Sequence, residues 1–289
     1  GGGGGGRVAG VAGVPRGGGA GPGGVGAPGS SLGLGVQTIQ DYSASKEIYY
    51  AHVRYFLLGE AAAADAGRYL DYVERSVQAR LSAPLLVVRG GRAADAVMEC
   101  GGDKTEVTEA LSALDRDVQR TGGMRLFTCC ETASALSRSG AALLQAVAAV
   151  PADPVTGGEG LAITPDGLAV LKDGAPCGWI DSADSSGAAL LMGDLPGGPV
   201  TLGSGVTLAI TGGGVETVPV WSGEGALAEL RFRVSAEAAV TELARDAELA
   251  DSGETDALEA ELSAEIGKWV RAVLETSRET GADFLELGR

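Results

Sequence analysis

The chain has 289 residues, of which 45% are apolar and 21% charged, and its formal net charge is −16. This length and apolar content suffice for two domains with hydrophobic cores and argue against a chain that is disordered throughout. The acidic balance argues against nucleic-acid binding, which needs clustered lysine and arginine, and against docking on anionic lipid headgroups.

The first 35 residues consist mainly of glycine, with proline, alanine and valine between them. A segment of this composition buries too little apolar surface to offset its chain entropy. Val8, Val11 and Val14 are the remnants of a possible strand pattern. We therefore expect residues 1–35 to be mostly flexible and dispensable for folding.

Residues 36–155 form the next part of the chain, in which helical patterns predominate. A helix is predicted over 60–80, because its apolar residues recur at spacings of three and four and share one face. These residues are Tyr69, Leu70, Val73 and Val77. The run 85–88 is short, apolar and flanked by Pro84 and Gly90, which predicts a buried strand. Further helices are predicted over 93–98, 104–120, 129–139 and 141–150.

A cluster of prolines and glycines marks a domain boundary near residue 155. Its members are Pro151, Pro154, Gly157 and Gly158. Beyond this cluster, two apolar runs, 168–171 and 177–180, flank the dipeptide Asp173-Gly174. Because glycine tolerates the positive φ that tight turns need, this pattern predicts a β-hairpin.

More strands and one long helix follow this hairpin. Strands are predicted over 206–210 and 215–220, separated by a glycine-rich turn at 211–214. Apolar and charged residues alternate strictly over 229–234, which is typical of a strand with one solvated face in an antiparallel sheet. A helix is predicted over 254–280 from a single apolar stripe. This stripe consists of Leu258, Leu262, Ile266, Trp269, Val270, Val273 and Leu274.

Two sets of motifs follow one another along the chain. The first set is Lys46, His52-Val53, Gly59-Glu60, Ala64, Gly67, Leu70-Asp71, Arg75, Arg80, Val87-Val88 and Gly90 to Ala93. The second set begins with the segment 160–181 and ends with Gly281-Ala-Asp-Phe-Leu-Glu-Leu-Gly288. In this order, over about residues 36–289, the chain resembles the Ger(x)C family, the C subunits of spore germinant receptors.

The resemblance implies an α+β protein with two domains, 36–155 and 156–289, each a mostly antiparallel β-sheet flanked by helices, after the flexible segment 1–35. It also implies a non-enzymatic C subunit of a nutrient germinant receptor, acting in spore germination on the outer face of the spore inner membrane. The implied partners are the A and B membrane subunits of that receptor. Family members are lipoproteins with an acylated cysteine ahead of the first domain, and we expect this anchor to be absent from the present chain.

Candidates for catalysis or metal binding are few. A Ser-His-Asp site would have to use His52, the one histidine, whose apolar surroundings favour a packed side chain, and no G-x-S-x-G motif occurs. Cys100, Cys129, Cys130 and Cys177 lack zinc-ligand spacing and are expected to be small buried side chains, although the pattern leaves a disulfide open. We therefore expect no catalytic, cofactor-binding or metal-binding residues.

Two residue pairs and two other function classes stay open at this point. Trp179 and Trp221 are expected to be buried in the sheet region, with a binding surface as the alternative. Arg75 and Arg80 are expected to form local ion pairs, with an interface as the alternative. The competing classes are an extracytoplasmic hydrolase that uses His52 and a solute-binding or assembly module with a cleft near the 151–160 boundary.

Overall fold

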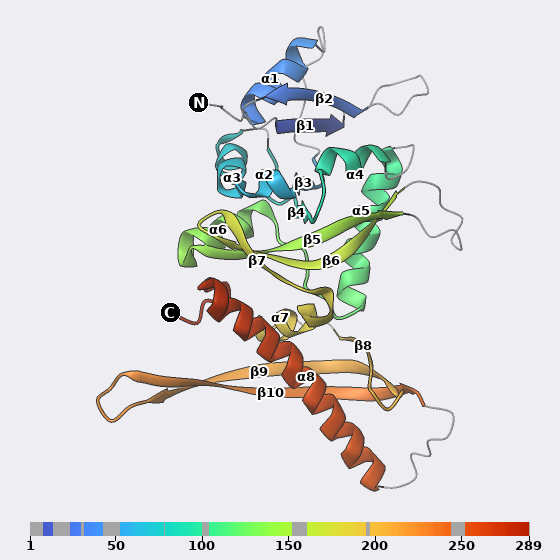
Figure 1. The fold of residues 1–289 in the computed structure, drawn as a ribbon, viewed down its shortest axis with the longest axis vertical. Helices are drawn as coiled ribbons and strands as arrows, with labels where there is room; N and C mark the ends of the chain where they lie inside the picture. Colours follow the sequence, from blue (N-terminus) through green and yellow to red (C-terminus); the bar gives the residue numbers. More distant parts are fainter. Residues whose placement is uncertain are drawn as a thin grey trace. The chain divides into compact units, whose positions relative to one another are not determined.

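The computed structural model describes nine stretches of the chain: residues 8–13, 24–29, 32–42, 53–77, 79–99, 104–151, 161–194, 197–243 and 252–288. The chain divides into two compact units (Figure 1). Unit 1 contains Gly1–Leu114, Leu126–Trp179 and Ala282–Arg289, and unit 2 contains Asp115–Arg125 and Ile180–Gly281. Each unit combines helices with a β-sheet, which confirms the α+β class with two domains.

Unit 1 contains a five-stranded sheet in the order β3-β4-β5-β6-β7. Its strands are β3 (Phe56–Gly59), β4 (Leu85–Val88), β5 (Ala141–Pro151), β6 (Leu161–Lys172) and β7 (Ala175–Ile180). The pairs β3–β4 and β4–β5 are parallel, and β5–β6 is antiparallel. The sheet is therefore mixed where a mostly antiparallel one was expected, because helices connect the first three strands and return the chain to the same end of the sheet.

The helices between these strands largely follow the predicted pattern. They are α2 (Glu60–Ala63), α3 (Ala66–Arg75), α4 (Ala93–Glu99), α5 (Lys104–Arg120) and α6 (Cys129–Ser139). The helix expected over 60–80 is interrupted after Ala63 and ends at Arg75, because Ser76 adopts an extended conformation. Leu70 and Val73 are buried as predicted, but Val77 lies beyond the helix and is fully exposed, so its assignment to the apolar face was wrong.

The helix predicted over 141–150 is wrong, because this segment is strand β5. Gly140 ends α6 with a left-handed φ of 72°, and its N–H donates to the carbonyl of Leu136. The following residues, Ala141 to Val147, are all buried between β4 and β6. A strand buried on both faces shows no alternation, so an alanine-rich apolar run of this length is ambiguous between helix and strand.

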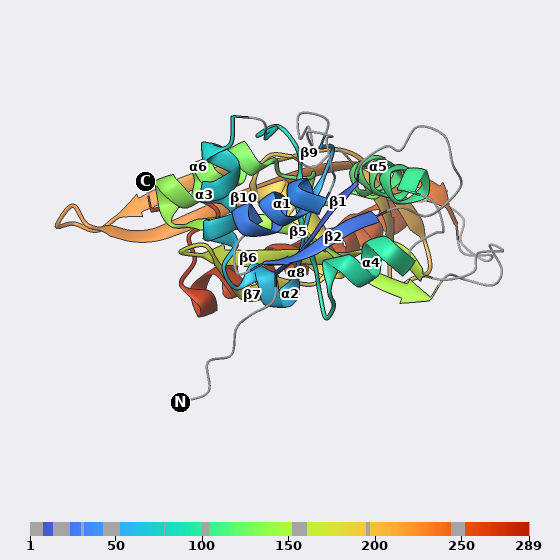
Figure 2. The same ribbon diagram turned by 90° about the horizontal axis from the view of Figure 1, so that it is seen from above.

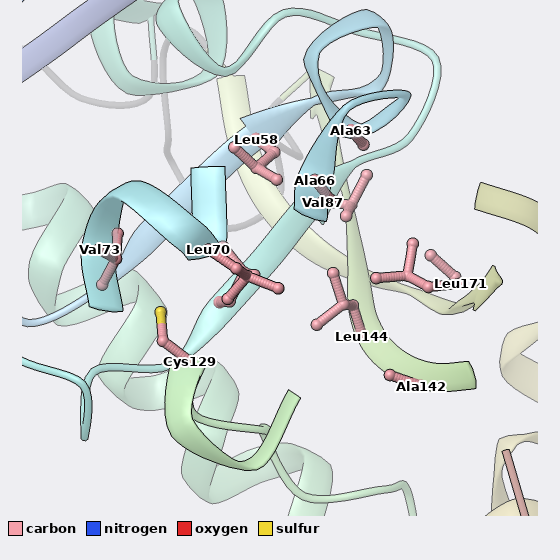
Figure 3. Packing of buried hydrophobic residues seen from close by; sticks show 12 residues of the cluster. Leu58, Ala63, Ala66, Leu70, Val73, Val87, Cys129, Ala142, Leu144 and Leu171 are labelled. Atoms are coloured by element: carbon pink, nitrogen blue, oxygen red, sulfur yellow. The ribbon is translucent and has the colours of Figure 1, made fainter. Parts of the chain in front are cut away.

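The core of unit 1 forms where α3 and α6 pack on one face of this sheet. Figure 3 shows the side chains that gather there. They come from β3, the helices and alternate positions of the other strands: Leu58, Ala63, Ala66, Leu70, Val73, Leu85, Val87, Cys129, Ala142, Leu144, Ala169 and Leu171. Intervening strand residues such as Leu86, Leu143 and Val170 are also buried, so the sheet is covered on both faces in its centre.

Two local features of unit 1 depend on glycine. Asp173 and Gly174 have φ values of 51° and 81° and join β6 to its sheet neighbour β7, which confirms the predicted hairpin. A Cβ at Gly174 would lie 2.8 Å from the Cα of Gly67, whose N–H donates to the Gly174 carbonyl at 2.9 Å. The two backbones therefore approach each other at a distance that excludes side chains.

The glycine-rich N-terminal segment contains regular structure. Strands β1 (Val8–Gly13) and β2 (Gly24–Gly29) pair antiparallel over their full lengths, and α1 (Leu32–Tyr42) follows them. The expectation that residues 1–35 are mostly flexible is thus wrong for these two strands. Strand pairing uses backbone hydrogen bonds, so it does not require the large apolar side chains on which that expectation was based.

Unit 2 contains a three-stranded antiparallel sheet in the order β10-β9-β8. Its elements are η3 (Ser182–Asp184), α7 (Ser185–Leu191), β8 (Gly198–Thr201), β9 (Thr207–Trp221), β10 (Leu227–Glu242) and α8 (Ser252–Thr280). The turn predicted at 211–214 is wrong, because β9 continues through it with Thr211 as an extra residue opposite the Glu237–Ala238 step. The glycines stay in the strand because β10 supplies partners for their backbone groups.

The core of unit 2 lies between α8 and this sheet. The predicted apolar stripe is confirmed: Leu262, Ile266, Trp269 and Val270 are buried against the sheet residues Val200, Leu208 and Ile210. The helix ends at Gly281, which has a φ of 59°. Chain termination by a left-handed glycine is the expected end of such a helix.

The compact units do not follow the boundary expected at residue 155. Strands β6 and β7 complete the sheet of unit 1, although they lie beyond that boundary in the sequence. The chain also returns to unit 1 after Gly281, where Ala282 and Phe284 are buried and Glu286 accepts a 2.6 Å ion pair from Arg138. The closing motif of the sequence is therefore part of the first unit's core.

Candidate interaction surface on the β9–β10 hairpin

The longest strands of the chain form a hairpin that continues past the rest of its sheet. Strand β8 pairs only with Thr207–Ile210, whereas β9 and β10 stay paired from Thr207 to Trp221 (Figures 1 and 2). Figure 1 shows the closed end of this hairpin extending beyond α8 within unit 2. From Thr211 onward, β9 therefore has β10 as its one strand neighbour among the described residues.

The two faces of the extended hairpin differ in chemistry. Residues directly opposite in an antiparallel pair share a face. One face, the apolar face, carries the pairs Trp221–Leu227, Pro219–Leu230, Thr217–Phe232 and Val215–Val234. The opposite face, the charged face, carries the pairs Val220–Glu229, Val218–Arg231 and Glu216–Arg233. All charged side chains of this stretch therefore lie on one face.

The charges on the charged face are paired with one another. Arg231 contacts Glu229 on the same strand at 3.0 Å, and Arg233 contacts Glu216 across the hairpin at 2.6 Å. The hydrogen bonds from Arg231 lower the pKa of Glu229 below its usual value. All four side chains are more than half exposed, so these pairs are solvated and contribute little to stability.

The apolar face is buried at one end and open at the other. Near α8, Val234 and Ala236 pack against the core of unit 2. Toward the closed end, Trp221 is 62% exposed and Leu227 is 48% exposed. Two-stranded ribbons without a covering layer are marginally stable in water, and exposed clusters of large apolar side chains commonly mark interaction sites. The open end of this face is the candidate interaction surface.

The two tryptophans of the sheet regions differ in their surroundings. Trp179 is half-buried against the core of unit 1, and the guanidinium of Arg89 lies 4.8 Å from its ring centre. Trp221 is the most exposed tryptophan of the apolar face, so the expectation that it is buried is wrong and the alternative of a binding surface applies. The alternation over 229–234 indicated a strand with a solvated face, but no sequence signal showed that the opposite face would also be open.

The predicted arginine pairs are confirmed in part. Arg75 donates to both carboxylate oxygens of Asp71 at 2.9 Å, and these hydrogen bonds lower the pKa of Asp71. Arg80 instead donates to the hydroxyl of Ser82 at 2.9 Å. Both interactions are local and exposed, so they resemble ordinary surface contacts of a helix and a turn.

The remaining candidate residues do not form a catalytic or metal centre in the part of the chain that the structure describes. His52 and Cys100 lie outside the described residues. Cys129 is buried, and burial raises the pKa of its thiol to about 12, whereas Cys130 and Cys177 are exposed free thiols. Within the described ranges, no group of three or more His, Cys, Asp or Glu side chains could hold a metal ion.

A membrane-spanning helix is likewise not found among the described residues, since none of their helices is both long and apolar enough. Comparisons with known proteins cover nearly the whole chain. One family model, the spore germination protein N-terminal domain, matches residues 8–145. A second, described as spore germination B3/GerAC like, C-terminal, matches residues 166–289. No curated protein sequence matches the chain at a significant level.

A solved structure shares the fold. The crystal structure of the GerBC protein is similar to this chain with a TM-score of 0.61 and 19% sequence identity. The similarity covers 86% of this chain and 71% of the GerBC chain. At this identity the comparison concerns the arrangement of helices and strands and not the residues of any site.

Proposed function

Because the chain belongs to the Ger(x)C family of spore germinant receptor C subunits, we propose that it acts as the non-enzymatic C subunit of a nutrient germinant receptor. The observation that carries this proposal is the match of both family domains, in order, to residues 8–145 and 166–289. The family consists of receptor subunits and is not a known family of enzymes. The proposed role is therefore assembly and signalling in spore germination.

The proposed partners are the A and B membrane subunits of the receptor, and the proposed location is the outer face of the spore inner membrane. A lipid anchor on the mature protein would hold the chain there, as in other members of the family. The net charge of −16 opposes adsorption to anionic headgroups. Attachment would then depend on the lipid and on protein partners, and not on charge.

The apolar face of the β9–β10 hairpin is the surface that we propose contacts a membrane subunit. It presents Trp221 and Leu227 to solvent without any charged neighbour on the same face. Large aromatic and aliphatic side chains supply most of the binding free energy in protein interfaces. The charged face, whose charges are paired, would remain in water.

The competing hydrolase and solute-binding proposals receive no support from the described residues. The hydrolase would depend on His52, and the solute-binding cleft would depend on the boundary segment at 152–160; both lie outside those residues. No feature of the described chain favours either class over the receptor subunit.

Co-purification from spores tests the proposal. A tagged, lipid-anchored form of the chain should recover a permease-like membrane subunit from solubilised inner membranes. Leu227→Ser should reduce that recovery severalfold, whereas Leu243→Ser should not. Leu243 is a matched control because it is 39% exposed, close to the 48% of Leu227, but follows the opposite end of β10. Recovery of the chain without any membrane subunit would contradict the proposal.

A further inference from the structure

The outer edge of β10 has the properties of a strand that pairs with another strand. Strand β10 lies at the edge of its sheet, so one side of its backbone has no strand neighbour among the described residues. Register shifts interrupt it only near its ends, at Leu227/Glu229 and Val240/Glu242. The third shift, at Glu237/Ala238, comes from the extra residue Thr211 on β9 and leaves β10 regular.

This edge also lacks the usual devices that prevent pairing. Proteins protect exposed edges with proline, lysine or short strands. Residues 227–242 contain neither proline nor lysine, and the strand is 16 residues long. An edge of this length and regularity is a template for a further strand.

The outward-facing backbone groups can be identified from one hydrogen bond. The hydroxyl of Thr211, on β9, donates to the carbonyl of Glu237 at 3.3 Å, so the backbone of Glu237 faces β9. Because backbone groups alternate in direction along a strand, the even-numbered residues face outward. These residues are Leu230, Phe232, Val234, Ala236, Ala238 and Val240.

We propose that a second copy of the chain adds its β10 antiparallel to this edge, about a two-fold axis at Val234 or Ser235. Either register pairs outward-facing residues with outward-facing residues, as an antiparallel ladder requires. Either register also places Glu237 of one copy opposite an arginine of the other. With the axis at Val234 this is Arg231, and with the axis at Ser235 it is Arg233.

Charge complementarity selects these two registers from the neighbouring ones. A two-fold axis at Arg231 or Arg233 would place two identical arginines opposite each other, and an axis at Phe232 would place Arg231 opposite Arg233. Like charges directly opposite are destabilising in a sheet. Glu237 has no ion-pair partner among the described residues, so its carboxylate is available to the second copy.

The resulting dimer would have a continuous six-stranded sheet, with the apolar faces of both hairpins on the same side. The paired edge would be about 34 Å long, at roughly 3.4 Å per residue. A single strand edge gives an interface at the small end of the range for specific complexes, so dissociation constants in the micromolar range are expected. The proposal does not depend on which receptor subunit the chain contacts.

Sedimentation equilibrium of the purified full chain, from about 1 to about 500 µM, tests the proposal. The wild type should form a dimer that dissociates on dilution. Glu237→Arg should weaken the dimer at least about tenfold, because it opposes two arginines in either register. Glu259→Arg makes the same charge change on the exposed surface of α8 and should leave the dimer unchanged.

A second substitution distinguishes the registers and guards against an unfolded variant. In the Glu237→Arg background, Arg231→Glu should restore the dimer if the axis lies at Val234, and Arg233→Glu should restore it if the axis lies at Ser235. A wild type that remains monomeric over the whole range would overturn the proposal. So would a Glu237→Arg variant that dimerises like the wild type, or a folded one that neither second substitution rescues.

Discussion

The contact between α7 and α8 allows a sharp prediction about Gly187. A Cβ at this buried position would lie 2.6 Å from the carbonyl carbon of Trp269 on α8 and 3.0 Å from its Cβ. Carbon atoms in contact prefer separations of about 3.5–4.0 Å, so Gly187→Ala would push the helices apart by about 1 Å. Overpacking of this kind costs about 1–3 kcal/mol, and the better helix propensity of alanine returns up to about 1 kcal/mol. We expect a net loss of about 1–2 kcal/mol.

Chemical unfolding of the full chain, followed by tryptophan fluorescence and circular dichroism, measures this loss. Gly267→Ala is the matched control, since it lies within α8 and its Cβ would meet only the flexible guanidinium of Arg271. This control should gain about 0.5–1 kcal/mol from helix propensity. A Gly187→Ala variant as stable as the wild type would refute the close packing of α7 on α8.

Three further predictions concern buried and titratable residues. Trp269→Ala should lower the free energy of unfolding by about 3–5 kcal/mol, because Trp269 is buried between α8 and the sheet; a loss below about 0.5 kcal/mol would show that the stripe is not core. In the native protein, thiol reagents followed by peptide mass spectrometry should label Cys130 and Cys177 but spare Cys129, whose thiol pKa is raised to about 12 by burial; fast labelling of Cys129 would contradict its burial. Burial and neighbouring carboxylates raise the pKa of Asp184, so the folded state binds its proton more tightly and stability falls as pH rises through that raised pKa. Asp184→Asn should therefore raise the melting temperature at pH 7 and lose this advantage below about pH 4, and equal melting curves at both pH values would contradict the assignment.

Local signals in the sequence predicted the elements whose cause is local. The apolar stripe of α8 and the Asp173-Gly174 turn depend on side chains and conformations within the element, and both are found. The segment 141–150 was assigned to a helix because its burial on both faces is decided by β4 and β6, which are distant in sequence. The same reason explains the glycines at 212–214, which stay in a strand because β10 pairs with them.

The candidate interaction surface was only partly predictable for the same reason. Alternation over 229–234 indicated which residues share a face of the strand. It could not indicate how far α8 would extend over the apolar face, because that depends on where the helix crosses the sheet. The exposure of Trp221 and the open edge of β10 are consequences of this tertiary arrangement.

Genetic complementation tests the central claim most directly. Spores that lack their own C subunit would receive a lipid-anchored form of this chain, and germination would be followed after addition of the nutrient. The receptor-subunit account predicts that germination is restored, and that removing the acylated cysteine weakens it by lowering the effective concentration at the membrane. Spores that contain the anchored chain at the normal level of a C subunit, together with the A and B subunits of its own receptor, and still fail to respond would contradict the account.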